Sequence, residues 1–333
     1  MPRAGAPSEG PHGALARAVG PRGIAALAQR GSRESTLALS AAGFPGLTFD
    51  GEHERATIGR EATERLLDRI GMAYLRAERA VGAPPHEQLA ALVEQLRQAE
   101  QSRPRVIKVE LMGPVSLALL VSDEHERPLA YDPALRETLV QHVTLRAAWV
   151  RDLIGSAGAT ALICLDEPLL DALSSPFCPL DEDEGHDMLA RALAELRGPR
   201  GVCAAGRPAW DTLLTLPVDV IFFDAYEQSA GLVQAATLVA SFLNGGGALG
   251  WGIVPTDTAA MAQERAETLA RRFATTVEYL AAAGGLAPEQ ISGSALISTS
   301  GGLGQLPAAQ AVQAATLCAK VSGAARAMFG LSN

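Results

Sequence analysis

Short runs of β-forming residues alternate with longer segments of helical periodicity along most of this chain of 333 residues. In residues 61–81, for example, apolar side chains recur at three- and four-residue steps, as on one face of a helix. A repeated strand–helix pattern favours parallel strands joined by right-handed crossovers. The candidate strands are residues 47–50, 105–111, 160–165, 201–204, 218–223, 248–254 and 295–298.

We therefore expect an α/β protein with one (β/α)8 barrel, a TIM barrel, over residues 24–333. An eighth strand is easily missed in a sequence, so the closed barrel is favoured over an open doubly wound sheet, which is the alternative. Such barrels commonly take about 250 residues, and no repeat or long linker indicates a second domain. Residues 1–23 are rich in Gly, Ala and Pro without a continuous apolar stretch, which predicts a flexible N-terminal extension rather than a secretory signal.

Composition and net charge argue against some classes of binding partner. The formal net charge of −9 argues against a nucleic-acid binder, which would need a basic face. No apolar run approaches the roughly 18 residues that indicate a membrane-spanning helix. The four cysteines form no CxxC pair and no disulfide framework, so we expect a cytoplasmic protein whose partner is a small molecule. The acidic segment 181–186 predicts a surface turn.

Acidic residues follow four of the candidate strands: Asp50, Glu110, Asp166 and Asp224. In a parallel barrel the active site lies at the carboxyl ends of the strands. Each acid alone could equally cap the next helix. Together they indicate a rim that binds an ammonium group or serves as acid and base.

Further candidates lie at the same strand ends. Gly113 begins a Gly-Pro turn that could bring backbone close to a ligand, and Ser300 precedes a glycine-rich turn that could cradle an anion, although such turns are common. Cys203 is a candidate nucleophile, with a buried apolar filler as the alternative. Trp251 suits the core or a pocket wall. The predicted catalytic residues are Cys203 and Asp224, and the predicted substrate-binding residues are Asp166, Glu167, Glu110, Gly113, Tyr226, Trp251 and Ser300.

Several longer motifs resemble the uroporphyrinogen decarboxylase/methionine synthase superfamily. They are ELMGPVSLAL, LDEPLL, GVCAAGRPAW, DVIFFDAYE, GGGALGWGIVPT and STSGGLGQL. The resemblance spans roughly residues 27–325. It is strongest to short, single-barrel proteins that correspond to the catalytic half of cobalamin-independent methionine synthase.

The resemblance implies a methyltransferase of methionine biosynthesis that acts on an amino-acid thiol such as homocysteine. It also implies a folate-type methyl donor, with a homo-oligomer or a methyl-donor protein open as further partners. In the family a zinc ion converts the acceptor thiol to a thiolate, because a thiol with a pKa of about 8.5 is mostly protonated at neutral pH. The motif around Asp166 would contact the amino group of the acceptor.

The zinc ligands of the family are poorly matched. Its histidine position holds Cys203, one cysteine position holds Ala205, and the last cysteine position holds Gly301. The acidic ligand falls on Asp224. Only His53 is a candidate substitute, so we expect no tetrahedral zinc bound by the protein.

Three interpretations remain at this point. The chain is a methyltransferase without the usual zinc site, a non-catalytic barrel that binds a small molecule, or a metal-free decarboxylase. The decarboxylase ranks lowest, because it would need basic groups to hold a polycarboxylate substrate. Acids dominate the rim, and Arg207 is the obvious basic residue there that the family pattern lacks. The family's loop for the acceptor carboxylate is matched only by Pro11 and His12.

Overall fold

A parallel sheet forms the centre of the molecule. The computed structural model describes residues 25–26, 36–78, 87–99, 104–207, 209–304 and 306–331. All neighbouring strands of the central sheet are parallel, and their order follows the sequence without a reversal. The strands, in spatial order, are β1 (Ala25–Ala26), β4 (Val106–Met112), β6 (Thr160–Glu167), β7 (Arg200–Ala204), β8 (Val220–Phe223), β9 (Ala248–Val254) and β10 (Ala295–Thr299).

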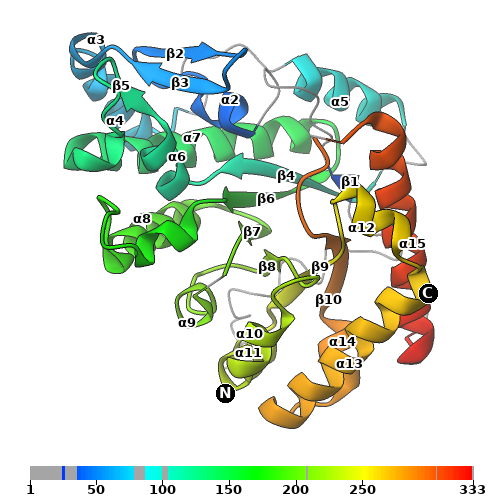
Figure 1. The fold of residues 1–333 in the computed structure, drawn as a ribbon. Coiled ribbons are helices and arrows are strands. Elements are labelled where there is room, and N and C mark those ends of the chain that lie inside the picture. Colours follow the sequence, from blue (N-terminus) through cyan, green and yellow to red (C-terminus); the bar gives the residue numbers. More distant parts are fainter. Residues whose placement is uncertain are drawn as a thin grey trace, which may run out of the picture.

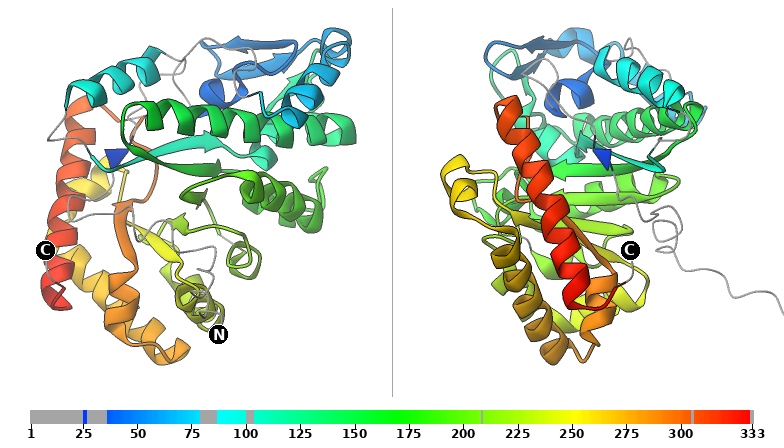
Figure 2. Two further views of the ribbon diagram at one scale, coloured as in Figure 1. Left: turned by 180° about the vertical axis from the view of Figure 1, so that it is seen from behind. Right: turned by 90° about the vertical axis from the view of Figure 1, so that its right-hand side faces the viewer.

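The sheet curls, with helices along its outer side (Figures 1 and 2). A doubly wound sheet would reverse its strand order at a switch point, and the described strands show no reversal. In the described part of the chain the edge strands β1 and β10 are not paired with each other, so the observed architecture is a half-barrel. The complete eight-stranded barrel that the sequence predicts is not found there.

One predicted barrel strand lies elsewhere. Residues 47–50 do form a strand, but it pairs antiparallel with the strand that follows it. The reason is local: the turn over residues 51–54, with Glu54 at a φ of 50°, returns the chain at once instead of leading into a crossover helix. The result is a separate three-stranded sheet of β2 (Leu47–Asp50), β3 (Arg55–Ile58) and β5 (Ser122–Asp123).

Helices follow most of the central strands. Those of the first half are α2 (Thr36–Ala41), α3 (Arg60–Glu64), α4 (Leu67–Leu75), α5 (Glu87–Gln98), α6 (Pro114–Leu120), α7 (Pro133–Ser156) and α8 (Glu182–Glu195). Those of the second half are α9 (Trp210–Leu213), α10 (Ser229–Gln234), α11 (Ala236–Asn244), α12 (Thr258–Gln263), α13 (Ala266–Gly284), α14 (Pro288–Gly293) and α15 (Ala308–Met328).

The acidic segment 181–186 is not a turn, as predicted, but the start of α8. The Asp181 side chain accepts a hydrogen bond from the Glu184 backbone N–H at 2.8 Å, and the Glu184 side chain accepts one in return from Asp181. This reciprocal capping satisfies two N–H groups that the helix cannot pair internally. The acids of the first turn also interact favourably with the helix dipole.

Alternation along the strands separates two faces of the sheet. On β4, Ile107, Val109 and Leu111 pack into the main core beneath the helices. The other face turns inward, and its apolar layer is a small cluster of its own. That cluster consists of Val106, Leu162, Cys164, Val220 and Phe222. We call this concave side the inner face.

Two further sequence predictions concern the N-terminal residues and membrane-spanning helices. The N-terminal extension of residues 1–23 and the Pro11–His12 pair lie outside the described residues. No helix in the described part is long and apolar enough to cross a membrane.

Candidate functional site

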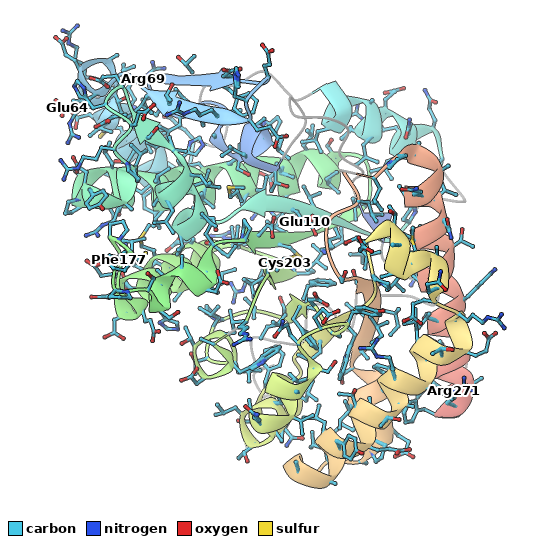
Figure 3. The ribbon with its side chains drawn as sticks, in the orientation of Figure 1. Glu64, Arg69, Glu110, Phe177, Cys203 and Arg271 are labelled. Atoms are coloured by element: carbon cyan, nitrogen blue, oxygen red, sulfur yellow. The ribbon has the colours of Figure 1, made fainter. Side chains whose placement is uncertain are left out.

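Four polar side chains lie together on the inner face: Lys108, Glu110, Asp166 and Cys203. Lys108 and Glu110 lie two residues apart on β4 and so point to the same side. Strand register brings the others alongside, because Asp166 of β6 is aligned with Cys203 of β7. Figure 3 shows Glu110 and Cys203 near the middle of the molecule.

Lys108 is an ammonium ion inside the half-barrel. Its Nζ lies 2.6 Å from Glu110 Oε1 and 3.7 Å from the centre of the Phe222 ring, and 11% of its side chain is exposed. Burial works against the charge, but nearby negative charge, including that of Glu110, outweighs burial and raises the pKa of Lys108 above its usual value. The aromatic face further stabilises the cation. Lys108 is therefore a fixed positive charge that reaches from β4 across to β8.

Cys203 is held as a neutral thiol. Its Sγ donates a hydrogen bond to Glu110 Oε1 at 3.7 Å. A hydrogen bond with Cys164 and burial raise the pKa of Cys203 well above its usual value, although the Lys108 charge partly opposes this. Because the thiolate is the nucleophilic form, this environment weighs against a nucleophilic role for Cys203.

Asp166 is the inner-face carboxylate for which the described residues supply no hydrogen-bond donor. Among the described residues, no side chain or backbone group donates a hydrogen bond to its carboxylate, whereas its backbone carbonyl accepts from the Gly113 N–H at 2.8 Å. Burial, and then repulsion from Glu110 and Glu167, raise the pKa of Asp166 to about 7, while Lys108 lowers it. The group is nevertheless partly accessible.

Glu167 follows Asp166 but faces the other way. Its fully buried carboxylate accepts hydrogen bonds from the backbone N–H groups of Val115 at 3.1 Å and Ser116 at 2.7 Å, at the start of α6. Burial raises its pKa to about 7, although the hydrogen bonds with Ser116 and Val115 oppose the shift. A Cβ atom on Gly113 would lie 2.1 Å from Glu167 Oε1. The close approach of the Gly113 backbone is therefore to Glu167, which caps a helix.

Asp224 and Tyr226 brace the loop after β8. Asp224 Oδ1 accepts from the backbone N–H groups of Tyr226 at 2.9 Å and Glu227 at 3.0 Å, and burial raises its pKa. The Tyr226 hydroxyl donates to Glu264 Oε1 at 2.8 Å, while the Arg272 guanidinium stacks on its ring at 4.3 Å. Both side chains are thus engaged in local structure.

Three other candidates do not join the inner-face group. Trp251 is fully buried on the outer face, because side chains alternate along β9 and its position faces away from the inner side. Ser300 accepts from the backbone N–H of Thr256 at 3.2 Å and ties together the loops after β9 and β10. Asp50 lies in the β2–β3 hairpin, where it accepts from the Glu52 backbone and pairs with His53 at 2.7 Å.

Of the four positions that the sequence resemblance assigns to zinc ligands, two carry side chains that could bind a metal. Cys203 offers a thiol and Asp224 a carboxylate, but Ala205 and Gly301 offer no donor side chain, and both are exposed beyond the ends of their strands. His53 lies in the hairpin and cannot substitute. Nowhere in the described ranges do three or more His, Cys, Asp or Glu side chains gather so as to hold a metal ion.

Sequence reasoning missed Lys108. The available signal was a lysine two residues before Glu110, on the same side of a strand whose other residues are apolar, since a buried charge is costly unless it is paired. Attention to the strand ends alone passed over it. With Lys108 included, the described residues of the inner face carry one cation, two carboxylates, the thiols of Cys164 and Cys203, and an aromatic ring.

Two solved structures resemble this chain over part of their length. A B12-independent methionine synthase from Shewanella sp. W3-18-1, solved in complex with selenomethionine, matches at a TM-score of 0.52 and 15% identity, over 72% of this chain and 68% of that chain. A methyltransferase from Methanosarcina mazei matches at a TM-score of 0.46 and 13% identity, over 75% and 68%. No protein-family model and no curated protein sequence matches the chain. At these identities the likeness concerns the fold.

Proposed function

We propose that this chain, which shares the fold of cobalamin-independent methionine synthase, is a methyltransferase-like protein that holds an amino-acid-like small molecule by its protonated amine at Asp166. The observation that carries this proposal is the Asp166 carboxylate itself. It is partly buried on the inner face, and none of the described residues donates a hydrogen bond to it.

An ammonium group complements this environment. A carboxylate removed from water is costly unless it is paired and hydrogen-bonded, and an amine supplies both a charge and N–H donors. Glu110 offers a second carboxylate nearby, close enough to raise the pKa of Asp166. Binding of an amine would lower that pKa, since an opposite charge favours the ionised carboxylate.

In the family, zinc activates the acceptor thiol for the transfer step, and the corresponding positions of this chain lack two of its ligands. Methylation of a thiol by a folate-type donor forms an S–C bond and breaks the N–C bond of the donor, and the thiol proton ends on the leaving nitrogen. Ala205 and Gly301 supply no ligands for zinc, so the proposed reaction does not depend on that metal. In this proposal the chain contributes binding and orientation of the amine, and the donor is of the folate type that the sequence resemblance implies.

A non-catalytic small-molecule-binding protein is the second candidate. Its support is the Cys203 environment, which keeps the thiol protonated and offers no activated nucleophile. A decarboxylase acting on a polycarboxylate is disfavoured, because Glu110 and Asp166 would repel such a substrate.

Calorimetric titration of the full chain with homocysteine tests amine recognition. We expect binding by the wild type, loss of about tenfold or more in affinity for Asp166→Asn, and no binding of N-acetylhomocysteine, whose amine carries no charge. Asp183→Asn on the exposed first turn of α8 is the matched control. Equal affinity of Asp166→Asn and wild type would disprove the proposal.

Turnover then separates the two candidates. Formation of methionine from methyltetrahydrofolate and homocysteine, without added zinc, supports the methyltransferase; binding without turnover supports the non-catalytic protein. Metal analysis of protein purified without chelators completes the test. One tightly bound zinc per chain would contradict the conclusion that the ligand positions do not fit the metal.

A further inference from the structure

Within the described part of the chain, the charged side chains of the inner face leave one net negative charge when Asp166 is ionised. Lys108 contributes one positive charge, and Glu110 and Asp166 contribute two negative charges. Their separation is small enough for the charges to act on one another, since both Glu110 and Lys108 shift the pKa of Asp166.

The positive charge is tied to one of the two carboxylates. Lys108 Nζ lies 2.6 Å from Glu110 Oε1 and 3.7 Å from the centre of the Phe222 ring. The same Glu110 oxygen also accepts from Cys203. Glu110 is therefore already neutralised within the protein, whereas Asp166 is not.

We propose that Lys108 determines the charge of the ligand that the inner face accepts, so that the site binds a single ammonium group and rejects a second one. This inference rests on the proposed function, because it assumes that Asp166 receives an amine. A monoamine brings one positive charge to one uncompensated carboxylate. A diamine would bring a second ammonium toward Glu110, which Lys108 already occupies, and like charges at short range in a partly dry site repel strongly.

A purely structural lysine and a lysine that sets the charge requirement would have different effects when replaced. A lysine that merely fills space would affect stability and leave the relative affinity for monoamines and diamines unchanged. A lysine that sets the charge requirement would change that ratio.

Titration calorimetry with butylamine and putrescine, which have four-carbon chains, measures the ratio directly. The wild type is expected to bind butylamine at least as tightly as putrescine. Lys108→Met leaves two uncompensated carboxylates, and we expect the preference to shift toward putrescine by about tenfold or more. Lys108→Arg retains the charge and the wild-type preference.

A double variant provides the matched control for charge. Lys108→Met with Glu110→Gln removes both members of the ion pair and restores one net negative charge. We expect it to recover the wild-type preference although it lacks the lysine. A preference for putrescine that persists in the double variant would overturn the inference.

Folding is controlled by a second single variant. A loss of near-ultraviolet circular dichroism would show that Lys108→Met does not fold, and Glu110→Gln then tests the role of Lys108 instead. This variant leaves the positive charge of Lys108 and the negative charge of Asp166, which cancel. The affinity for butylamine should therefore fall about tenfold. An unchanged affinity in Glu110→Gln would overturn the inference, as would an unchanged ratio in a folded Lys108→Met.

The two proposals fail differently. If Asp166→Asn loses amine binding but the ratio does not move, the role of Lys108 is wrong and the amine site stands. If the wild type binds no amine, or Asp166→Asn binds as well as the wild type, the amine site itself is wrong and the inference falls with it.

Discussion

Glu167 Oε1 lies against the backbone of Gly113, 2.1 Å from where a Cβ atom of that residue would stand. The contact allows the Glu167 carboxylate to reach the first N–H groups of α6. Asp166, one residue earlier, points to the inner face instead. Two adjacent carboxylates thus have different tasks, because successive side chains of a strand face opposite sides.

Gly113→Ala should destabilise the protein by about 1–3 kcal/mol, since the methyl group would push Glu167 away from α6. Urea unfolding measures the change. Gly155→Ala in α7 is the control: a Cβ atom there meets nothing within 4 Å, and we expect a neutral or slightly stabilising effect. Equal effects of the two substitutions would refute the steric explanation.

Asp166→Asn should stabilise the protein at alkaline pH. The folded protein holds the Asp166 proton up to a pKa of about 7, whereas the unfolded chain releases it near the ordinary aspartate pKa of 3.8. Stability from this group is therefore complete below about pH 4 and is lost as the pH rises through 7. We expect the variant to gain about 1–3 kcal/mol over wild type at pH 8, and less at pH 5. Unfolding curves at both pH values measure this; a difference independent of pH would indicate a well-solvated carboxylate.

Tyr226→Phe should cost about 1 kcal/mol of stability and leave amine affinity unchanged. It removes the hydroxyl that donates to Glu264, whose side chain is 14% exposed and would lose a partner. Thermal unfolding and titration calorimetry give the two quantities. Tyr279→Phe on exposed α13 serves as the neutral control. Weaker amine binding by Tyr226→Phe would mean that Tyr226 contacts the ligand, as the sequence predicts.

A zinc site should be recoverable by substitution. Cys203→His, Ala205→Cys and Gly301→Cys together supply three donors, and Asp224 remains as the fourth. Only Oδ1 of Asp224 receives hydrogen bonds within the described ranges, which leaves Oδ2 for a metal. We expect the triple variant to bind one zinc per chain in competition with a chelator, and the single variants to bind none tightly. A triple variant without zinc affinity would mean that the loops after β7, β8 and β10 do not converge as the resemblance implies.

Much of the central sheet could be predicted from local pattern. The strands after residue 100 were predicted within about two residues, because each is a short apolar run between helical segments. The first predicted strand was assigned to the wrong sheet, since its residues cannot show whether the chain returns in a hairpin or crosses over. The acids were predicted as one rim, but strand ends alone do not show which side chains face inward.

The sequence by itself determined the alternation of strands and helices, the acids near the strand ends, and the absence of donors at Ala205 and Gly301. Each of these is fixed by residue type and by distance along the chain. The tertiary structure decided which polar groups meet. Strand register and the curl of the sheet decide that Lys108 pairs with Glu110 and that Cys203 contacts the same carboxylate. They also decide that none of the described residues donates to the Asp166 carboxylate. These bring three strands, far apart in sequence, to one inner face where burial makes each charge matter.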